Sequence, residues 1–147
     1  MFIMNRIEDI YPIMRETLDR GNTFTFPVKG TSMQPLLHTN DSVTLKSFVS
    51  YKKGDIVFFI RDNGQFVLHR IKKVKKDIYL IVGDHQTVLE EVPQKYVIAK
   101  VIAYKKRGKE KVNNLKGLRY KTYSLMCRLK LFRWFNAHFR WEIKNIV

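Results

Sequence analysis

Residues 56–71 have the sequence Ile-Val-Phe-Phe-Ile-Arg-Asp-Asn-Gly-Gln-Phe-Val-Leu-His-Arg-Ile, and this stretch decides the fold class. The Asn-Gly pair at 63–64 supplies the positive φ angles of a tight hairpin turn, and an apolar run lies on each side of it. Side chains alternate between the two faces of an extended chain. His69 therefore shares a face with its apolar neighbours, whereas Arg70 lies on the other face. The stretch predicts a β-hairpin that carries one histidine in an apolar setting.

Further strand-like runs extend in both directions from this hairpin. They are apolar, or they alternate apolar with polar residues, and turn signals separate them. They lie at 24–28, 42–46, 78–82 and 96–104. The short intervals between turn signals favour an antiparallel or mixed β body without βαβ units.

A helix is predicted ahead of the β body, over residues 5–20. Apolar residues recur there at spacings of three and four, and Gly21 follows as a C-terminal stop. Pro12 lies inside the pattern, so the helix is either kinked or begins nearer residue 10. The fold class is therefore mainly β (α+β) with an N-terminal helix.

The C-terminal part of the chain differs in both charge and period. Residues 104–147 carry +11 of the net charge of +15. Over about 115–144, apolar residues recur with a helical period and basic residues gather on another side, which predicts an amphipathic helix. We divide the chain into a β-rich body, 1–107, and a basic helical tail, 108–147.

Composition excludes several classes of protein. A hydrophobic share of 45% in 147 residues is typical of a folded domain with a real core. The single cysteine, Cys127, cannot form an internal disulfide, so nothing indicates an oxidising compartment. The first residues include acids where a secretory signal would be apolar, and no apolar run approaches the roughly 20 residues of a membrane span. We expect a cytoplasmic protein, attached at most to a membrane surface.

A second stretch, Gly30-Thr31-Ser32-Met33-Gln34-Pro35, carries the candidate nucleophile. Glycine, small hydroxyl residues and proline within six positions predict a backbone bend. A serine at a bend is usually a turn residue, and it becomes a nucleophile only with a base within hydrogen-bond reach. His69 is the candidate base, although a lone histidine on a strand is more often structural.

Four segments together resemble the signal peptidase I superfamily, which includes the self-cleaving repressors of the bacterial damage response. They occur in the superfamily's order and cover about residues 24–104. They are Gly30–Pro35, Lys53-Gly54-Asp55-Ile56-Val57-Phe58, Val67-Leu68-His69-Arg70-Ile71 and Val82-Gly83-Asp84.

The resemblance implies a serine peptidase with Ser32 as nucleophile and His69 as base. Histidine stands at this position in the endoplasmic-reticulum and archaeal type, whereas most bacterial members have lysine. A neutral imidazole can accept the hydroxyl proton and return it to the leaving amine. The third member is Asp84 or Glu90, and we favour Asp84 because its reach depends on less loop. Of the paired acids expected near Glu90, one position reads Leu89 instead.

The oxyanion hole is expected at the backbone N–H of Ser32, with help from Thr31 and Gly30. The side-chain hydroxyl that many relatives carry two residues before the nucleophile is absent, because Gly30 occupies that position. His38 and His85 have no Cys or His partners at metal-ligand spacing, so we predict neither metal nor cofactor.

The leading functional hypothesis is an endopeptidase that cuts leader or precursor peptides, with the substrate extended along a strand edge near Ser32. The alternative is an inactive peptidase-fold binding module whose tail contacts a membrane, nucleic acid or a partner protein. Basic residues with Trp134 and Trp141 favour an anionic membrane as partner for 115–144. Nucleic acid is less favoured because no helix-turn-helix precedes the β body. A tail that covers its own body or forms a dimer seam, and hence a homo-oligomer, stays open.

Overall fold

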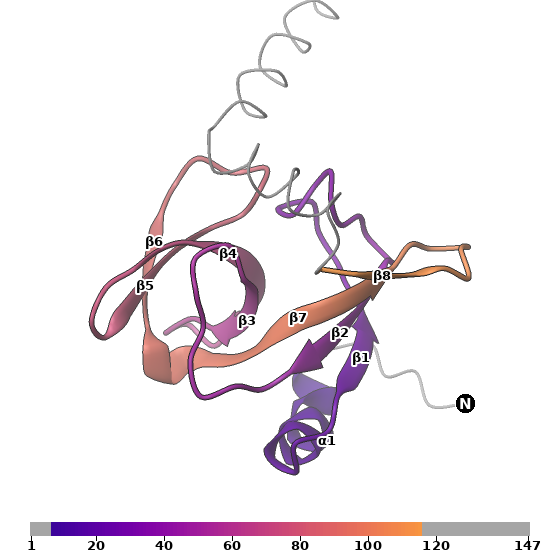
Figure 1. Ribbon diagram of the computed structural model, residues 1–147, viewed down its shortest axis with the longest axis horizontal. Helices are drawn as coiled ribbons and strands as arrows, with labels where there is room; N and C mark the ends of the chain where they lie inside the picture. Colours follow the sequence, from indigo (N-terminus) through magenta and orange to yellow (C-terminus); the bar gives the residue numbers. More distant parts are fainter. Residues whose placement is uncertain (1–6, 116–147) are drawn as a thin grey trace, which may run out of the picture. The chain divides into compact units, whose positions relative to one another are not determined.

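The computed structural model describes residues 7–115 of the chain, and this part is mainly β (Figure 1). Its elements are α1 (Ile7–Asp19), β1 (Phe24–Pro27), β2 (Ser42–Lys46), β3 (Ile56–Ile60), β4 (Phe66–Val74), β5 (Ile78–Val82), β6 (Glu90–Pro93), a 3₁₀ turn (Gln94–Tyr96), β7 (Val97–Lys105) and β8 (Val112–Asn114). The strand pairings within this part are antiparallel. The predicted fold class is confirmed.

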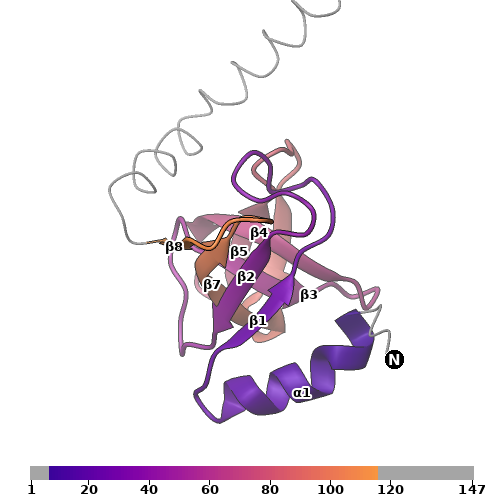
Figure 2. The same ribbon diagram turned by 90° about the vertical axis from the view of Figure 1, so that its right-hand side faces the viewer.

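Helix α1 runs through Pro12 and begins at Ile7. Acidic residues in its first turn complement the positive end of the helix dipole, and Met14 and Leu18 bury its apolar side. Gly21, with φ of +79°, ends it through a hydrogen bond from its N–H to the Leu18 carbonyl (3.0 Å). Figure 2 shows α1 below β1 and β3.

One coiled sheet contains all the strands of the described part. The strands follow the order β1-β2-β7-β3-β4-β5-β6, and β8 adds to β7. Lys100 of β7 pairs with Lys46 of β2 and with Val57 of β3, so these two strands lie on opposite edges of β7. Register shifts in the β2–β7, β3–β7 and β4–β5 pairs interrupt the ladders, and such irregularities bend and twist strands. The sheet can therefore curl around its own core.

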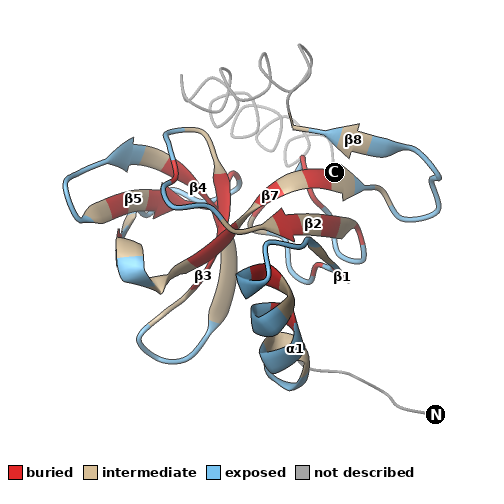
Figure 3. Cartoon of the chain, turned by 60° about the horizontal axis from the view of Figure 1, so that its bottom comes forward, coloured by how far each residue is buried: buried red, intermediate tan, exposed pale blue. Residues whose placement is uncertain are grey.

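The core lies along the sheet, and Figure 3 shows buried residues on β2, β3, β4, β5 and β7. One buried cluster joins side chains from the β3–β6 half of the sheet and the loop before it: Tyr51, Val57, Phe59, Ile71, Tyr79, Ile81 and Val92. His69 shares the face of β4 with Ile71 and packs near the Phe59 ring, with centroids 6.1 Å apart. The alternation in the hairpin sequence thus places the histidine beside the core.

Two strands extend the predicted architecture. β6 contains two glutamates and a proline, and β8 is Val-Asn-Asn, so neither has the composition of a strand. Because β8 pairs with β7, the sheet runs to Asn114. The sheet thus extends past residue 107, and the division into a β-rich body and a basic tail stays a prediction. The predicted helix of the tail falls outside the described residues. Within the described part, no helix has the length and apolar character to cross a membrane.

Candidate active site

Ser32 lies half-buried in a loop between β1 and β2 that its own turns hold in place. Gly30 has φ of +92°, which suits glycine and turns the chain just before the serine. The Thr39 hydroxyl donates to the Gly30 carbonyl (3.1 Å), and the Gln34 N–H donates to the Thr31 carbonyl (3.1 Å). The loop therefore presents Ser32 from a defined bend, as the sequence predicted.

The Gly-Asp segment after β5 docks directly onto this loop. The N–H of His85 donates to the Ser32 carbonyl (2.9 Å). A Cβ atom at Gly83 would lie 2.6 Å from the Ser32 carbonyl oxygen and 3.1 Å from His69 Nε2. Only a residue without a side chain permits these short distances. Gly83 therefore allows the serine loop and the His69 ring to lie close to the same backbone position.

His69 occupies a buried position on β4, with an exposed fraction of 1%. It pairs with Val57 of β3, and the register Arg70 to Val82 places Gly83 beside it on the β5 side. Its Nδ1 lies 2.9 Å from Oε1 of Glu90. An ionised carboxylate only accepts hydrogen bonds, so Nδ1 carries the proton and Nε2 is left as an acceptor on the side of Gly83 and Ser32.

Glu90 reaches the imidazole from β6, across β5. The register pairs Ile81 with both Ile71 and Glu90, and this places Glu90 on the face of the sheet that carries His69. Arg61 holds the same carboxylate through two hydrogen bonds, from Nε to Oε2 (2.6 Å) and from Nη2 to Oε1 (2.7 Å). Arg61, Glu90 and the His69 ring thus form one chain of polar contacts.

The electrostatics of this chain suit a neutral base beside an ionised acid. Burial lowers the pKa of His69 below its ordinary value of 6.5; the charge of Glu90 opposes this effect, and the charge of Arg61 adds to it. The hydrogen bond from Arg61 lowers the pKa of Glu90. At neutral pH the imidazole is therefore uncharged and the carboxylate is ionised.

The structure places Glu90, rather than the Asp84 that we favoured, at hydrogen-bond distance from the imidazole. Its carboxylate pairs with Arg70, from Nε to Oδ1 and from Nη2 to Oδ2, both at 2.7 Å. Arg70 Nη1 also donates to the carbonyl of Gly54 (2.9 Å). Both charged side chains are fully buried. Asp84 therefore fastens the hairpin to its neighbouring loops, and Glu90 is the carboxylate at the ring.

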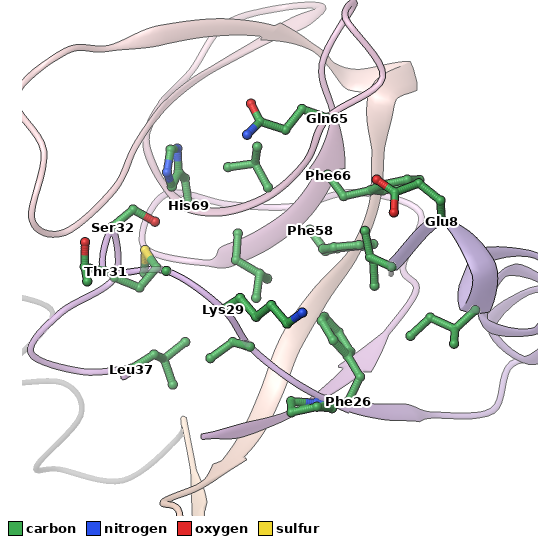
Figure 4. A pocket seen from close by; sticks show the side chains of 18 of the residues that line it. Glu8, Phe26, Lys29, Thr31, Ser32, Leu37, Phe58, Gln65, Phe66 and His69 are labelled. Atoms are coloured by element: carbon green, nitrogen blue, oxygen red, sulfur yellow. The ribbon is translucent and has the colours of Figure 1, made fainter. Parts of the chain in front are cut away.

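A groove of about 1290 Å³ opens beside Ser32 and His69. Figure 4 shows these two side chains at one end of it and Phe26, Phe58 and Phe66 farther along, toward α1. The rings of Phe58 and Phe66 stack with centroids 5.6 Å apart. Because the serine and the imidazole face one open groove, a bound chain can reach both.

The remaining predicted contributors are placed as follows. Within the described residues, the N–H of Ser32 has no hydrogen-bond partner, and no hydrogen bond joins its hydroxyl to the His69 ring. Catalytic hydrogen bonds of this kind often tighten only when substrate binds. Nδ1 of His38 lies 3.2 Å from Nζ of Lys106. Among residues 7–115, no cluster of three His, Cys, Asp or Glu side chains is arranged to hold a metal ion.

Arg61 is a residue of the site that the sequence did not predict. It follows β3 at the start of the Arg-Asp-Asn-Gly turn, where a charged residue usually points to solvent. Its N–H donates to the Gln65 carbonyl (2.9 Å), and its side chain donates to the Gln65 side chain. A signal was present in the pattern, because two long polar residues that flank a tight turn lie opposite each other across a hairpin and can interact.

Comparison with known proteins relates the chain to a peptidase family. The model of the Peptidase S24-like family matches residues 1–102. The chain is similar to the LexA repressor of Streptomyces coelicolor, with 28% identity over 104 residues that cover 69% of this chain and 43% of the repressor. The LexA repressor of Streptomyces avermitilis is 27% identical over the same shares. The chain thus spans less than half the length of these two relatives.

Proposed function

We propose that this chain, which belongs to the Peptidase S24-like family, is a serine peptidase with Ser32 as nucleophile, His69 as general base and Glu90 as the acid that orients the base. The family membership confirms the predicted relationship to the self-cleaving repressor peptidases. The observation that carries the proposal is the contact between His69 Nδ1 and Glu90 (2.9 Å), since it leaves Nε2 free to accept a proton beside the serine loop.

In the first step Ser32 Oγ attacks the carbonyl carbon of the scissile peptide bond, and His69 Nε2 takes the hydroxyl proton. Glu90 stays ionised and stabilises the imidazolium through Nδ1–H. The tetrahedral intermediate then expels the amine, which receives the proton from Nε2, and an ester remains on Ser32. Water, activated by the same imidazole, hydrolyses the ester and regenerates the serine.

The negative oxygen of the tetrahedral intermediate requires donors beside the nucleophile. The Ser32 N–H has no partner within the described residues, and it follows the bend at Gly30. Carbonyl groups on both sides are already engaged: that of Gly30 by Thr39 and that of Ser32 by His85. These contacts hold the backbone of the loop, so the N–H is oriented before substrate arrives. Thr31 and Gly30 position this donor.

The substrate is an extended peptide segment lying in the groove. β1 is the terminal strand of the sheet path, and its residues line the groove together with Ser32. An added strand would pair with the free edge of β1 and carry its scissile bond past the serine. A leader or precursor peptide, which is unfolded around its cleavage site, meets this requirement. A folded surface does not.

A peptide library tests the proposal over many substrate sequences at once. The purified chain is incubated with a mixture of unstructured peptides, and new termini are identified by mass spectrometry. We expect cleavage by the wild-type chain and none by Ser32→Ala, which removes one oxygen and leaves the loop contacts of the backbone intact. A matched control, Ser50→Ala, removes a hydroxyl from an exposed loop and should cleave normally. Equal cleavage by Ser32→Ala and wild type would exclude Ser32 as the nucleophile.

A further inference from the structure

We propose that Arg61 is a positioning residue that fixes the Glu90 carboxylate in the orientation the His69 imidazole requires; this inference rests on the proposed function of the same site. Arg61 lines the groove beside the site. It acts through Glu90, and through Glu90 on the tautomer and charge of the base.

The contacts of Arg61 define the plane of the carboxylate. Its guanidinium is a rigid fork that donates to both oxygens of Glu90, at 2.6 Å and 2.7 Å. Two hydrogen bonds in one plane leave the carboxylate little freedom to rotate. Oε1 then has a second lone pair directed toward His69 Nδ1, 2.9 Å away. Arg61 therefore sets the orientation of the His69 imidazole through the Glu90 carboxylate.

The hairpin turn in turn fixes Arg61. Gly64 adopts φ of +81°, and the Asn63 side chain accepts a hydrogen bond from the Gln65 N–H (3.0 Å). Gln65 then receives the backbone N–H of Arg61 on its carbonyl (2.9 Å) and the guanidinium on its side chain. The turn that decides the fold thus also holds the arginine that orients the site.

The positive charge of Arg61 also favours a neutral His69 and an ionised Glu90. The charged groups that act on the pKa of His69 are Glu90 from β6, Arg61 from the end of β3 and Asp84 from the end of β5. Asp84 is compensated by Arg70. Burial is the main cause of the lowered pKa of the imidazole, and the positive charge of Arg61 lowers that pKa further. The hydrogen bond from Arg61 lowers the pKa of Glu90 as well, so the acid stays ionised and the base neutral at the same pH.

The surroundings of Arg61 make its role measurable apart from folding. Its side chain is 30% exposed and that of Glu90 is 23% exposed. Partly hydrated pairs of this kind contribute little to stability. Arg61→Met removes the charge and the fork with a side chain of similar length. Arg61→Lys keeps the charge but presents a point donor that cannot clamp both oxygens. The matched control is Arg20→Met, which breaks an exposed arginine pair with Glu16 of α1.

The experiment measures the titration of His69 by NMR, assigned with His69→Gln, together with the pH profile of kcat/KM on a cleaved library peptide. In Arg61→Met we expect the titration midpoint to rise and kcat/KM at neutral pH to fall on the order of 10²-fold, as for a misplaced catalytic group. In Arg61→Lys the midpoint should stay near that of wild type while kcat falls. Arg20→Met should match wild type in both measurements.

The titration needs no activity, so the two proposals fail separately. A higher titration midpoint of His69 in Arg61→Met would support the proposed effect of Arg61 on the site. This holds even if no peptide is cleaved and the proposed peptidase function is wrong. A midpoint and a kcat/KM profile that match those of Arg20→Met would overturn the role of Arg61, whatever the activity of the wild-type chain.

Discussion

Two arginine–carboxylate pairs lie near each other in the sheet, and their surroundings give them opposite roles. Arg70–Asp84 and Arg61–Glu90 are both bidentate, with distances of 2.6 to 2.7 Å. The first pair is fully buried, whereas the side chains of the second are 30% and 23% exposed. In the second pair, Glu90 lies 2.9 Å from Nδ1 of the His69 imidazole. Identical chemistry therefore serves as scaffold in one place and as part of a site in the other.

The alternation of β4 separates the two roles. His69 and Arg70 are neighbours in sequence, and their side chains leave the strand on opposite faces. On one face Arg70 donates to the Gly54 carbonyl and to Asp84. Arg70 thereby connects β4 to the loop before β3 and to the loop after β5. On the other face His69 meets Glu90. One strand thus carries both a buried anchor of the fold and the proposed base, one residue apart.

The largest effect is expected from Asp84→Asn, which leaves the buried Arg70 charge uncompensated. Removing one partner of a buried pair costs about 3–5 kcal/mol, so the free energy of unfolding in urea should fall by that amount. The double variant Asp84→Asn with Arg70→Met should recover part of the loss, because no charge then stays buried alone. A single variant as stable as wild type would show that the pair is not the anchor described.

Glu90→Gln should have the opposite profile, with a large loss of activity and little loss of stability. The amide cannot stabilise an imidazolium as a carboxylate does, so we expect kcat/KM to fall on the order of 10²- to 10⁴-fold. The free energy of unfolding should change by less than about 1 kcal/mol, because the pair with Arg61 is partly hydrated. Full activity in this variant would return Glu90 to a purely structural role.

Gly83→Ala should fall between these two. Its new Cβ would lie 2.6 Å from the Ser32 carbonyl oxygen, which is backbone and cannot swing aside. The serine loop must move away from His69, and a displacement of this size costs on the order of 10²-fold in rate. Substrate affinity should change less, because the groove extends well beyond this point. Gly108→Ala is the control for the general effect on folding of replacing a glycine by alanine, because a Cβ there meets nothing within 4 Å. The φ of +69° at Gly108 adds some local strain to this control.

The pH dependence should be the mildest test. Because the pKa of His69 is lowered by burial, kcat/KM should rise with pH through a midpoint below 6.5 and reach its plateau by neutrality. The His69 imidazole takes up a proton more readily in the unfolded chain than in the folded one. The free energy of unfolding should therefore fall as pH drops through the unfolded and then the folded pKa of His69. An activity midpoint above 6.5 would contradict the neutral base.

Local patterns made much of this predictable. The Asn-Gly turn and the apolar alternation predicted the hairpin, and β2, β3 and β5 have the bounds predicted for them. Glu90 was not separable from Asp84 by sequence, because its position at the ring depends on the pairing of β5 with β6, and β6 has two glutamates and a proline. Asp84 is nearer than Glu90 to His69 along the sequence, which favoured Asp84 as the acid at the ring. The pairing of β5 with β6 instead brings Glu90 to the ring.

The role of Ser32 as nucleophile and His69 as base is tested by the rate at which a fluorophosphonate probe labels Ser32. The serine oxygen displaces fluoride from phosphorus, and His69 takes the proton, so labelling needs no known substrate. We predict an adduct on the peptide that contains Ser32, formed much more slowly in His69→Gln and in Glu90→Gln than in wild type or Arg20→Met. Labelling of Ser32 at the same rate in wild type and His69→Gln would contradict the account.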